Sequence, residues 1–186
     1  MESNSISTAN RLTAYKSEIT AFSKYTAFSL KAAQDGYRNI ALLYKAIATS
    51  ENIQAKNNAK KLQEKGTTIP SFEPVFTVKS TKENLMDDAA GDAFGTTLQL
   101  QDFIDTASKE SDAVAAAHFT HTLNTEKKYL ELFKNSIQAI NSNTSIGLAK
   151  SFMVCPGCGN TYAKSAPENC DYCMTEGFKF IVIDSL

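Results

Sequence analysis

Several features are missing from this chain of 186 residues, and each absence excludes a class of protein. No apolar run approaches the ~20 residues that a membrane-spanning helix needs, so we expect no membrane segment. Basic residues number 19 against 20 acidic ones, and this balance leaves no broad basic surface for nucleic acid. The first four residues, Met-Glu-Ser-Asn, lack the basic stretch that opens a secretory signal peptide. We also find no internal repeat and no segment of low complexity.

Cysteine is scarce as well, but its spacing is informative. The four cysteines form two Cys-x-x-Cys pairs, Cys155 with Cys158 and Cys170 with Cys173. In a chain with no export signal, this pattern favours a metal site over disulfides and predicts a cytoplasmic protein. Each pair places two thiolates on one tight turn, and two such knuckles close a tetrahedral site for zinc or for a single iron. The spacing alone does not distinguish a structural zinc from a one-electron iron centre.

The remaining composition is that of a globular protein, and its pattern is helical. Helices are predicted over about residues 8–33, 37–64, 81–108 and 112–140, with a capping box from Ser80 to Glu83. Pro70 and Pro74 exclude a helix from the link between the second and third segments. Short connections within each pair of helices, and this longer link between the pairs, predict a four-helix bundle over residues 1–145.

The composition changes after a polar linker. Residues 150–186 are rich in cysteine, proline and glycine, and we predict that they form a separate four-cysteine metal-binding domain. Phe178–Ile183 is the strongest strand candidate of the chain, because it combines aromatic and β-branched residues.

Each predicted helix carries one carboxylate on its apolar seam. The four-three spacing of the hydrophobic residues places these acids inward, and they are Glu18, Glu51, Asp92 and Glu126. A buried carboxylate is costly unless it takes a proton, a partner or a cation. In four-helix bundles, converging carboxylates commonly hold a pair of metal ions. The alternative is that the seams are displaced by one residue, which would leave these acids on the surface.

Together these motifs resemble the rubrerythrin family, over nearly the whole chain. The most specific strings are Ser50-Glu51-Asn52-Ile53-Gln54-Ala55-Lys56-Asn57 and Cys155-Pro156-Gly157-Cys158-Gly159 with the second cysteine pair. The resemblance implies a ferritin-like four-helix bundle followed by a rubredoxin-like domain. It implies that an iron pair in the bundle reduces hydrogen peroxide and that the cysteine-bound iron passes electrons in. It also implies an electron-donor protein, and a homodimer in which each tail lies near the partner's bundle.

The chain departs from the family at its metal ligands. Where the family has Glu-x-x-His in the second and fourth helices, this chain has Gln54 and Tyr129 in place of the histidines. In the third helix, a Glu-x-x-Glu motif is replaced by Asp92 and a glycine. Gln54 and Tyr129 remain able to hydrogen-bond or to ligate weakly, and the tyrosine ring can instead fill the vacated space. The two histidines of the chain, His118 and His121, lie off the Glu126 face of their helix and are poor replacements.

These observations leave three functions open. The first is a peroxide-reducing oxidoreductase with iron in the cysteine site and a remnant di-iron site at the four carboxylates. The second is a non-catalytic relative that keeps the cysteine centre for electron transfer or stability. The third is a zinc-ribbon adaptor that binds a protein partner. Because iron in a redox pair favours imidazole together with carboxylate, we predict that the di-iron site is impaired.

Overall fold

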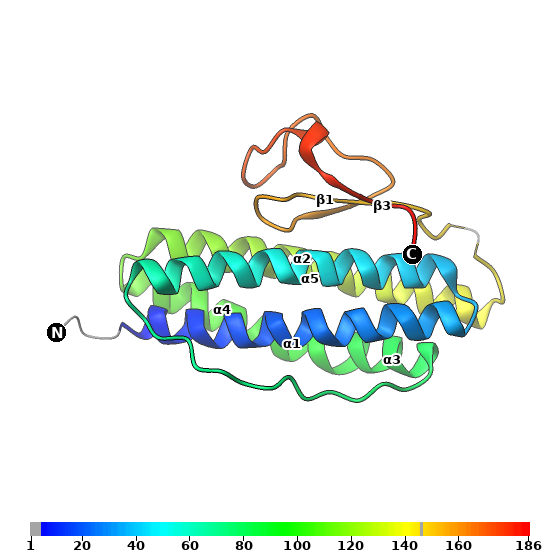
Figure 1. Cartoon of the computed structure of the whole chain (residues 1–186), viewed down its shortest axis with the longest axis horizontal. Helices are drawn as coiled ribbons and strands as arrows, with labels where there is room; N and C mark the ends of the chain where they lie inside the picture. The colour runs from blue at the N-terminus through cyan, green and yellow to red at the C-terminus, as the bar shows by residue number, and fades with distance from the viewer. Residues whose placement is uncertain (1–4, 146) are drawn as a thin grey trace.

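The bundle begins with a helical hairpin (Figure 1). The structure is a computed structural model that describes residues 5–145 and 147–186, apart from the side chains of residues 91–95. Helix α1 (Ile6–Gln34) and helix α2 (Arg38–Glu64) lie side by side along the molecule. Between them, Gly36 adopts a φ of +85°, a left-handed conformation that glycine tolerates and that ends the helix. The predicted break between these two helices is therefore confirmed.

The third predicted helix exists but is not continuous. Helix α3 (Thr81–Asp87) starts with the predicted capping box. The Ser80 hydroxyl accepts a hydrogen bond from the Glu83 amide, and the Glu83 carboxylate accepts one from the Ser80 amide. A π-helical turn over Asp88–Asp92 then interrupts the regular pattern, and helix α4 runs over Ala93–Lys109. A π turn inserts an extra residue and shifts the phase of every side chain that follows it. The expectation of one uninterrupted helix over residues 81–108 was wrong for this reason.

Helix α5 (Ala113–Asn141) completes the bundle. Its N-cap is Asp112, whose carboxylate accepts the Ala115 amide at 2.9 Å, as expected for an acidic cap. The core includes four aromatic rings from three helices with neighbouring centroids 5.5–6.1 Å apart, namely Tyr25, Phe28, Tyr44 and Phe133. Between α2 and α3, the link of residues 65–80 has no helix and runs along α1, where Phe72 meets Tyr15 edge to face (Figure 1).

The tail forms a three-stranded antiparallel sheet with strand order β2-β1-β3. The strands are β1 (Phe152–Val154), β2 (Thr161–Ala163) and β3 (Ile181–Ile183). The predicted strand over Phe178–Ile183 is therefore only half correct. A 3-10 turn over Gly177–Lys179 precedes β3, and it leaves Phe178 82% exposed while Phe180 packs against the cysteines.

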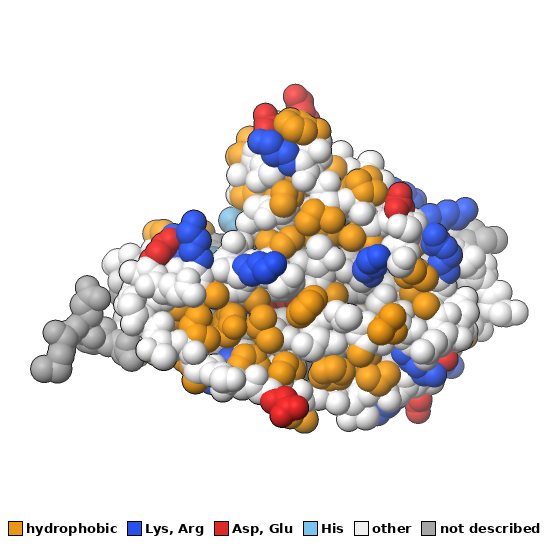
Figure 2. All heavy atoms as spheres, in the orientation of Figure 1, with side chains coloured by type: hydrophobic (Ala, Val, Ile, Leu, Met, Phe, Trp, Pro, Cys, Tyr) orange, Lys and Arg blue, Asp and Glu red, His pale blue; other side chains and the backbone are white. Residues whose placement is uncertain are grey.

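The tail stands out from the bundle as a separate lobe, and basic and acidic side chains are interspersed on this face of the molecule (Figure 2). Residues of β1 and β3 also contribute to the main hydrophobic cluster, which contains Phe152, Val154 and Ile183 beside bundle residues such as Tyr44. The architecture confirms the predicted fold class of a four-helix bundle followed by a small four-cysteine domain. Within the described part of the chain, no helix has the length and apolar character that crossing a membrane requires.

Candidate metal centre and carboxylate cavity

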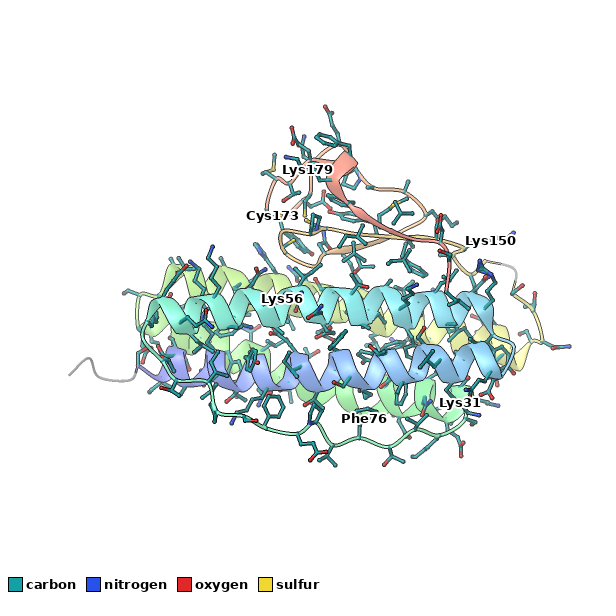
Figure 3. All side chains as sticks on the ribbon, in the orientation of Figure 1. Lys31, Lys56, Phe76, Lys150, Cys173 and Lys179 are labelled. Carbon is teal, nitrogen blue, oxygen red and sulfur yellow. The ribbon has the colours of Figure 1, made fainter. Side chains whose placement is uncertain are left out.

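The four cysteine sulfurs converge at one point of the tail. All four Sγ atoms lie within 4.8 Å of one another, with 3.4 Å between Cys155 and Cys173 and 3.5 Å between Cys158 and Cys170. A tetrahedral ion with metal–sulfur bonds of about 2.3 Å separates its ligand atoms by about 3.8 Å. The sulfur positions therefore fit a single tetrahedral metal ion. Cys173 is the exposed member of the set and lies in the raised lobe (Figure 3).

Local hydrogen bonds favour the thiolate of Cys155, whereas the hydrogen bond with Cys155 raises the pKa of Cys158 and burial raises the pKa of Cys173. The Gly159 amide donates to the Cys155 carbonyl at 2.9 Å, and Gly159 has a φ of +81°, so the first knuckle closes as a tight turn. Hydrogen bonds from the Cys158 thiol and from backbone amides lower the pKa of Cys155 to about 4. The side-chain amide of Asn160 lies 3.9 Å from the Cys170 sulfur, while the Tyr162 hydroxyl donates to the Asp171 carboxylate at 2.8 Å.

Three of the four predicted carboxylates line one cavity in the bundle. Glu18 and Glu51 are buried, Glu126 is half-buried, and they share a cavity of about 540 Å³. The side chain of Asp92 lies outside the described residues. Phe72 and Phe76 of the link line the same cavity. Phe76 is labelled in Figure 3.

Burial controls the protonation of these acids. It raises the pKa of Glu18 to about 8, with a further contribution from Glu126, while hydrogen bonds from Asn58 partly oppose the shift. Burial also raises the pKa of Glu51 well above its usual range, and the neighbouring Glu126 and Glu18 carboxylates add to the effect. In the absence of a cation, burial therefore favours the protonated form of both acids. One oxygen of Glu51, Oε1, is buried and has no protein partner.

Two polar residues that the sequence did not single out as functional complete the environment of Glu18. Asn58 donates to both Glu18 oxygens, and its own oxygen accepts from the Arg11 guanidinium at 2.9 Å. Arg11 and Asn58 are almost fully buried, with 2% and 0% exposure. A signal was present, because Arg11 lies seven residues before Glu18 and Asn58 seven after Glu51, which places each pair on one helical face.

Gln54 and Tyr129, at positions where the resemblance implies histidines, form hydrogen bonds on the side of the tail. The Gln54 amide donates to the Ser50 hydroxyl at 3.2 Å, and that hydroxyl donates to the Gly159 carbonyl at 2.6 Å. The Tyr129 hydroxyl pairs with the Thr161 hydroxyl at 3.2 Å. Both side chains are almost fully buried, and burial raises the pKa of Tyr129 well above its usual range. Of the alternatives left open by the sequence, these contacts correspond to the hydrogen-bonding one.

The two histidines lie away from the carboxylates, as helical geometry predicted. His118 lies 3.5 Å from the Arg11 guanidinium, and burial next to that charge lowers its pKa to about 4. His121 stacks on Tyr172 of the tail, with ring centroids 4.8 Å apart and planes 8° from parallel. Neither histidine is among the described residues that line the cavity.

The fold and the sites together define a ferritin-like bundle joined to a four-cysteine metal domain. The chain belongs to the rubrerythrin family, whose profile, described as Rubrerythrin, matches residues 12–137. It is 29% identical to Rubrerythrin-2 of Clostridium acetobutylicum over 171 residues, which cover 90% of this chain and 91% of the relative. It is 28% identical to Nigerythrin of Nitratidesulfovibrio vulgaris over 168 residues, or 88% and 80% of the two chains.

Solved structures agree with this assignment. A structure of fully reduced, all-ferrous nigerythrin superposes with a TM-score of 0.81 and 26% identity over 98% of this chain and 88% of that one. A bacterioferritin from Mycobacterium tuberculosis matches with a TM-score of 0.67 and 14% identity over 76% of this chain and 90% of that one, which shows a shared fold. The resemblance seen in the sequence is confirmed, and the matches support a non-haem iron protein of this family.

Proposed function

We propose that this protein is an electron carrier of the rubrerythrin family, in which one iron held by four cysteines exchanges single electrons in support of peroxide reduction. The observation that carries the proposal is the convergence of four sulfurs within 4.8 Å. Tetrahedral thiolate sites suit iron as well as zinc, and a bound iron would supply one-electron chemistry. The chain itself holds the sulfurs on two knuckles and directs the side-chain amide of Asn160 at Cys170.

Peroxide is the proposed final electron acceptor because of the family to which the chain belongs. Reducing one hydrogen peroxide to two waters consumes two electrons and two protons, so a one-electron centre must be oxidised twice for each peroxide. The raised pKa values of Glu18 and Glu51 favour protonated carboxyl groups in the bundle cavity. This arrangement supports a role in peroxide chemistry without assigning its step.

We further propose that the di-iron function of the bundle is impaired. The described donors do not fit an iron pair, because no imidazole lines the cavity and both Glu18 oxygens already accept from Asn58. The unpartnered Oε1 of Glu51 is an oxygen that a hard cation or a water could contact. We therefore derive no step through a di-iron centre.

A purely structural role of the metal is the second candidate, and one observation favours it. The core of the tail around the metal site consists of three buried cysteines and Phe180, with a few half-buried neighbours. So small a core rarely folds without a metal or another cross-link. A zinc ion would satisfy this requirement as well as iron, and the tail would then serve stability or partner binding.

The partners and the compartment remain proposals. We propose a homodimer and a separate electron-donor protein, both on family resemblance. We propose a cytoplasmic location because thiols paired for a metal, rather than joined as disulfides, suit a reducing compartment.

Metal analysis combined with a visible spectrum tests the proposed function, on protein expressed with ample iron. We expect one iron per chain with thiolate charge-transfer bands only, and bleaching on reduction that peroxide reverses. Glu51→Gln and Glu126→Gln should leave this reversal unchanged if the bundle pair is impaired. About three irons per chain, with peroxide turnover lost in both variants, would contradict the impairment. A colourless protein with one zinc would overturn the electron-carrier role in favour of the structural one.

A further inference from the structure

One lysine of the bundle extends to the metal domain. Lys128 lies on α5, and the raised lobe of the tail lies over α2 and α5 (Figure 1). The Lys128 ammonium donates to the side-chain oxygen of Asn160 at 2.7 Å. The same ammonium lies 5.1 Å from the ring centroid of Tyr162 and 5.1 Å from that of Tyr172. Both distances are within the range of an attractive cation–π contact, so three residues of the tail hold this charge in place.

The residues that hold the ammonium are close neighbours of the metal ligands. Asn160 lies two residues after Cys158, and its side-chain amide lies 3.9 Å from the sulfur of Cys170. Tyr172 directly precedes Cys173 in the second knuckle. A positive charge from the bundle is therefore fixed against the residues that carry the four sulfurs.

The setting of this charge is rigid and partly shielded from water. His121 of α5 stacks on the Tyr172 ring, with centroids 4.8 Å apart and planes 8° from parallel. His121 and Lys128 are seven residues apart, which places them on one face of the helix, and both contact the same tyrosine. Lys128 is half-buried there, so salt and water screen its charge less than that of an exposed lysine.

The charge of Lys128 and the negative charge of the metal site stabilise each other. Burial lowers the pKa of Lys128, and negative charge on Asp171, Cys170 and Cys158 opposes this shift. Because a Coulomb interaction is mutual, the ammonium stabilises negative charge on these sulfurs in turn. Four thiolates outweigh the charge of either ferric or ferrous iron, so an iron-loaded site is negative in both states and more negative after reduction. A fixed positive charge beside the site therefore favours its reduced state.

We propose that Lys128 raises the reduction potential of the four-cysteine site, because its half-buried ammonium beside Asn160 and Tyr172 favours the reduced state. This inference rests on the proposed electron-carrier function, since the potential matters only when the site holds iron. It adds to that function the residue that makes the centre easier to reduce by a weak electron donor. The four ligands are cysteines, so the contribution of the lysine is separable from metal binding by mutation.

Redox titration of the full-length, iron-loaded protein measures the effect. The titration follows the thiolate-to-iron absorption as a function of the applied potential. We expect Lys128→Met to lower the equilibrium constant for reduction about tenfold, which is a fall of about 59 mV for a one-electron couple. Every chain of the sample carries the substitution. The result is therefore the same whether the lysine beside a given tail belongs to its own chain or to the partner in the proposed homodimer.

Two further variants separate the charge from the contacts of the side chain. Lys128→Arg keeps a positive charge over the two rings, so the equilibrium constant should stay within about twofold of the wild type. Lys128→Gln keeps an amide donor for Asn160 but carries no charge, so its potential should fall as far as that of Lys128→Met. A wild-type potential in Lys128→Gln, or a full fall in Lys128→Arg, would overturn the role of the charge.

Lys127 provides the matched control, because it is the exposed neighbour of Lys128 on the same helix. Lys127→Met removes the same charge from a side chain that water and salt screen, so the equilibrium constant should change by less than about twofold. The absorption spectrum of the oxidised iron should be the same in all variants, which verifies that the four thiolates still bind the metal. Equal shifts in Lys127→Met and Lys128→Met would reduce the effect to the net charge of the chain and would refute the proposal.

The inference and the proposed function fail in different ways. A protein that takes only zinc in cells would lose the electron-carrier role, yet chain reconstituted with iron would still show the Lys128 shift. An unchanged potential in Lys128→Met would refute the inference about the lysine, yet it would leave an iron-loaded electron carrier.

Discussion

The amide nitrogen of Asn58 lies 2.9 Å from one oxygen of the Glu18 carboxyl group and 2.8 Å from the other. Asn58 therefore engages the whole carboxyl group, while its own oxygen is held by Arg11. This buried set of polar groups is satisfied only as long as Asn58 is present.

Asn58→Leu should consequently destabilise the protein. It leaves Glu18 and Arg11 without their shared partner in a buried site, at a cost of about 2–4 kcal/mol in the free energy of unfolding. Denaturant unfolding measures the loss, and Asn135→Leu, at an exposed position of α5, should change stability by less than about 0.5 kcal/mol. Equal effects of the two substitutions would show that the Asn58 contacts do not contribute.

His118 should make stability depend on pH. Its pKa in the folded protein is about 4 against an ordinary value of 6.5, so the unfolded chain binds the proton more readily between these values. The contribution is complete above pH 6.5 and is lost as the pH falls toward 4. As the pH falls from 7 to 5, the free energy of unfolding of the wild type should therefore drop by about 2 kcal/mol more than that of His118→Gln. Parallel pH profiles of the wild type and this variant would contradict the buried, neutral histidine.

Asp88 and Asp87 form a matched pair of neighbours in opposite environments. Asp88 is buried in the π-helical turn and accepts from the Lys24 ammonium at 3.0 Å and from the Tyr44 hydroxyl at 3.2 Å. Asp88→Ala leaves both donors short of a partner, so we expect a loss of about 2–4 kcal/mol. Asp87 pairs with Lys79 at the surface, and Asp87→Ala should cost less than about 1 kcal/mol. Thermal melts of both variants test the difference, and a larger loss for Asp87→Ala would refute the assignment.

Removal of one thiolate should affect the tail without unfolding the bundle. Cys158→Ala breaks the metal site, so we expect loss of the metal and a loosened tail. The bundle should remain helical, because the apolar contacts between its helices do not pass through the cysteines. Circular dichroism measures this outcome. Loss of most of the helical signal would show that the two parts fold as one unit.

The sequence predicted the helices well because their signals are local. The Ser80–Glu83 capping box and the break at Gly36 each depend on residues within one turn, and both are present in the structure. The π-helical turn at Asp88–Asp92 was not predictable, because a shift in helical phase changes no local propensity. The strand beginning at Phe178 was overestimated because β-propensity does not reveal that this side chain is exposed.

The candidate sites divide in the same way. Two Cys-x-x-Cys pairs predict a four-cysteine metal site from their spacing alone, and the structure brings all four sulfurs together. The contacts of Ser50 with Gly159 and of Tyr129 with Thr161 join residues 109 and 32 positions apart. No periodic pattern in the sequence predicts contacts between residues so far apart. The side chain of Asp92 and the domain boundary at residues 145–150 remain predictions.

Three of the four cysteines face the interior of the molecule, and only Cys173 is exposed. The centre therefore has two unlike sides, one that is buried and one that is open to solvent at the sulfur of Cys173. An external redox protein has one face of approach, while small oxidants in solution meet the same atom first. We expect oxidative loss of the metal to begin at Cys173. The sulfur that a redox partner can reach is therefore also the one that oxidants attack first.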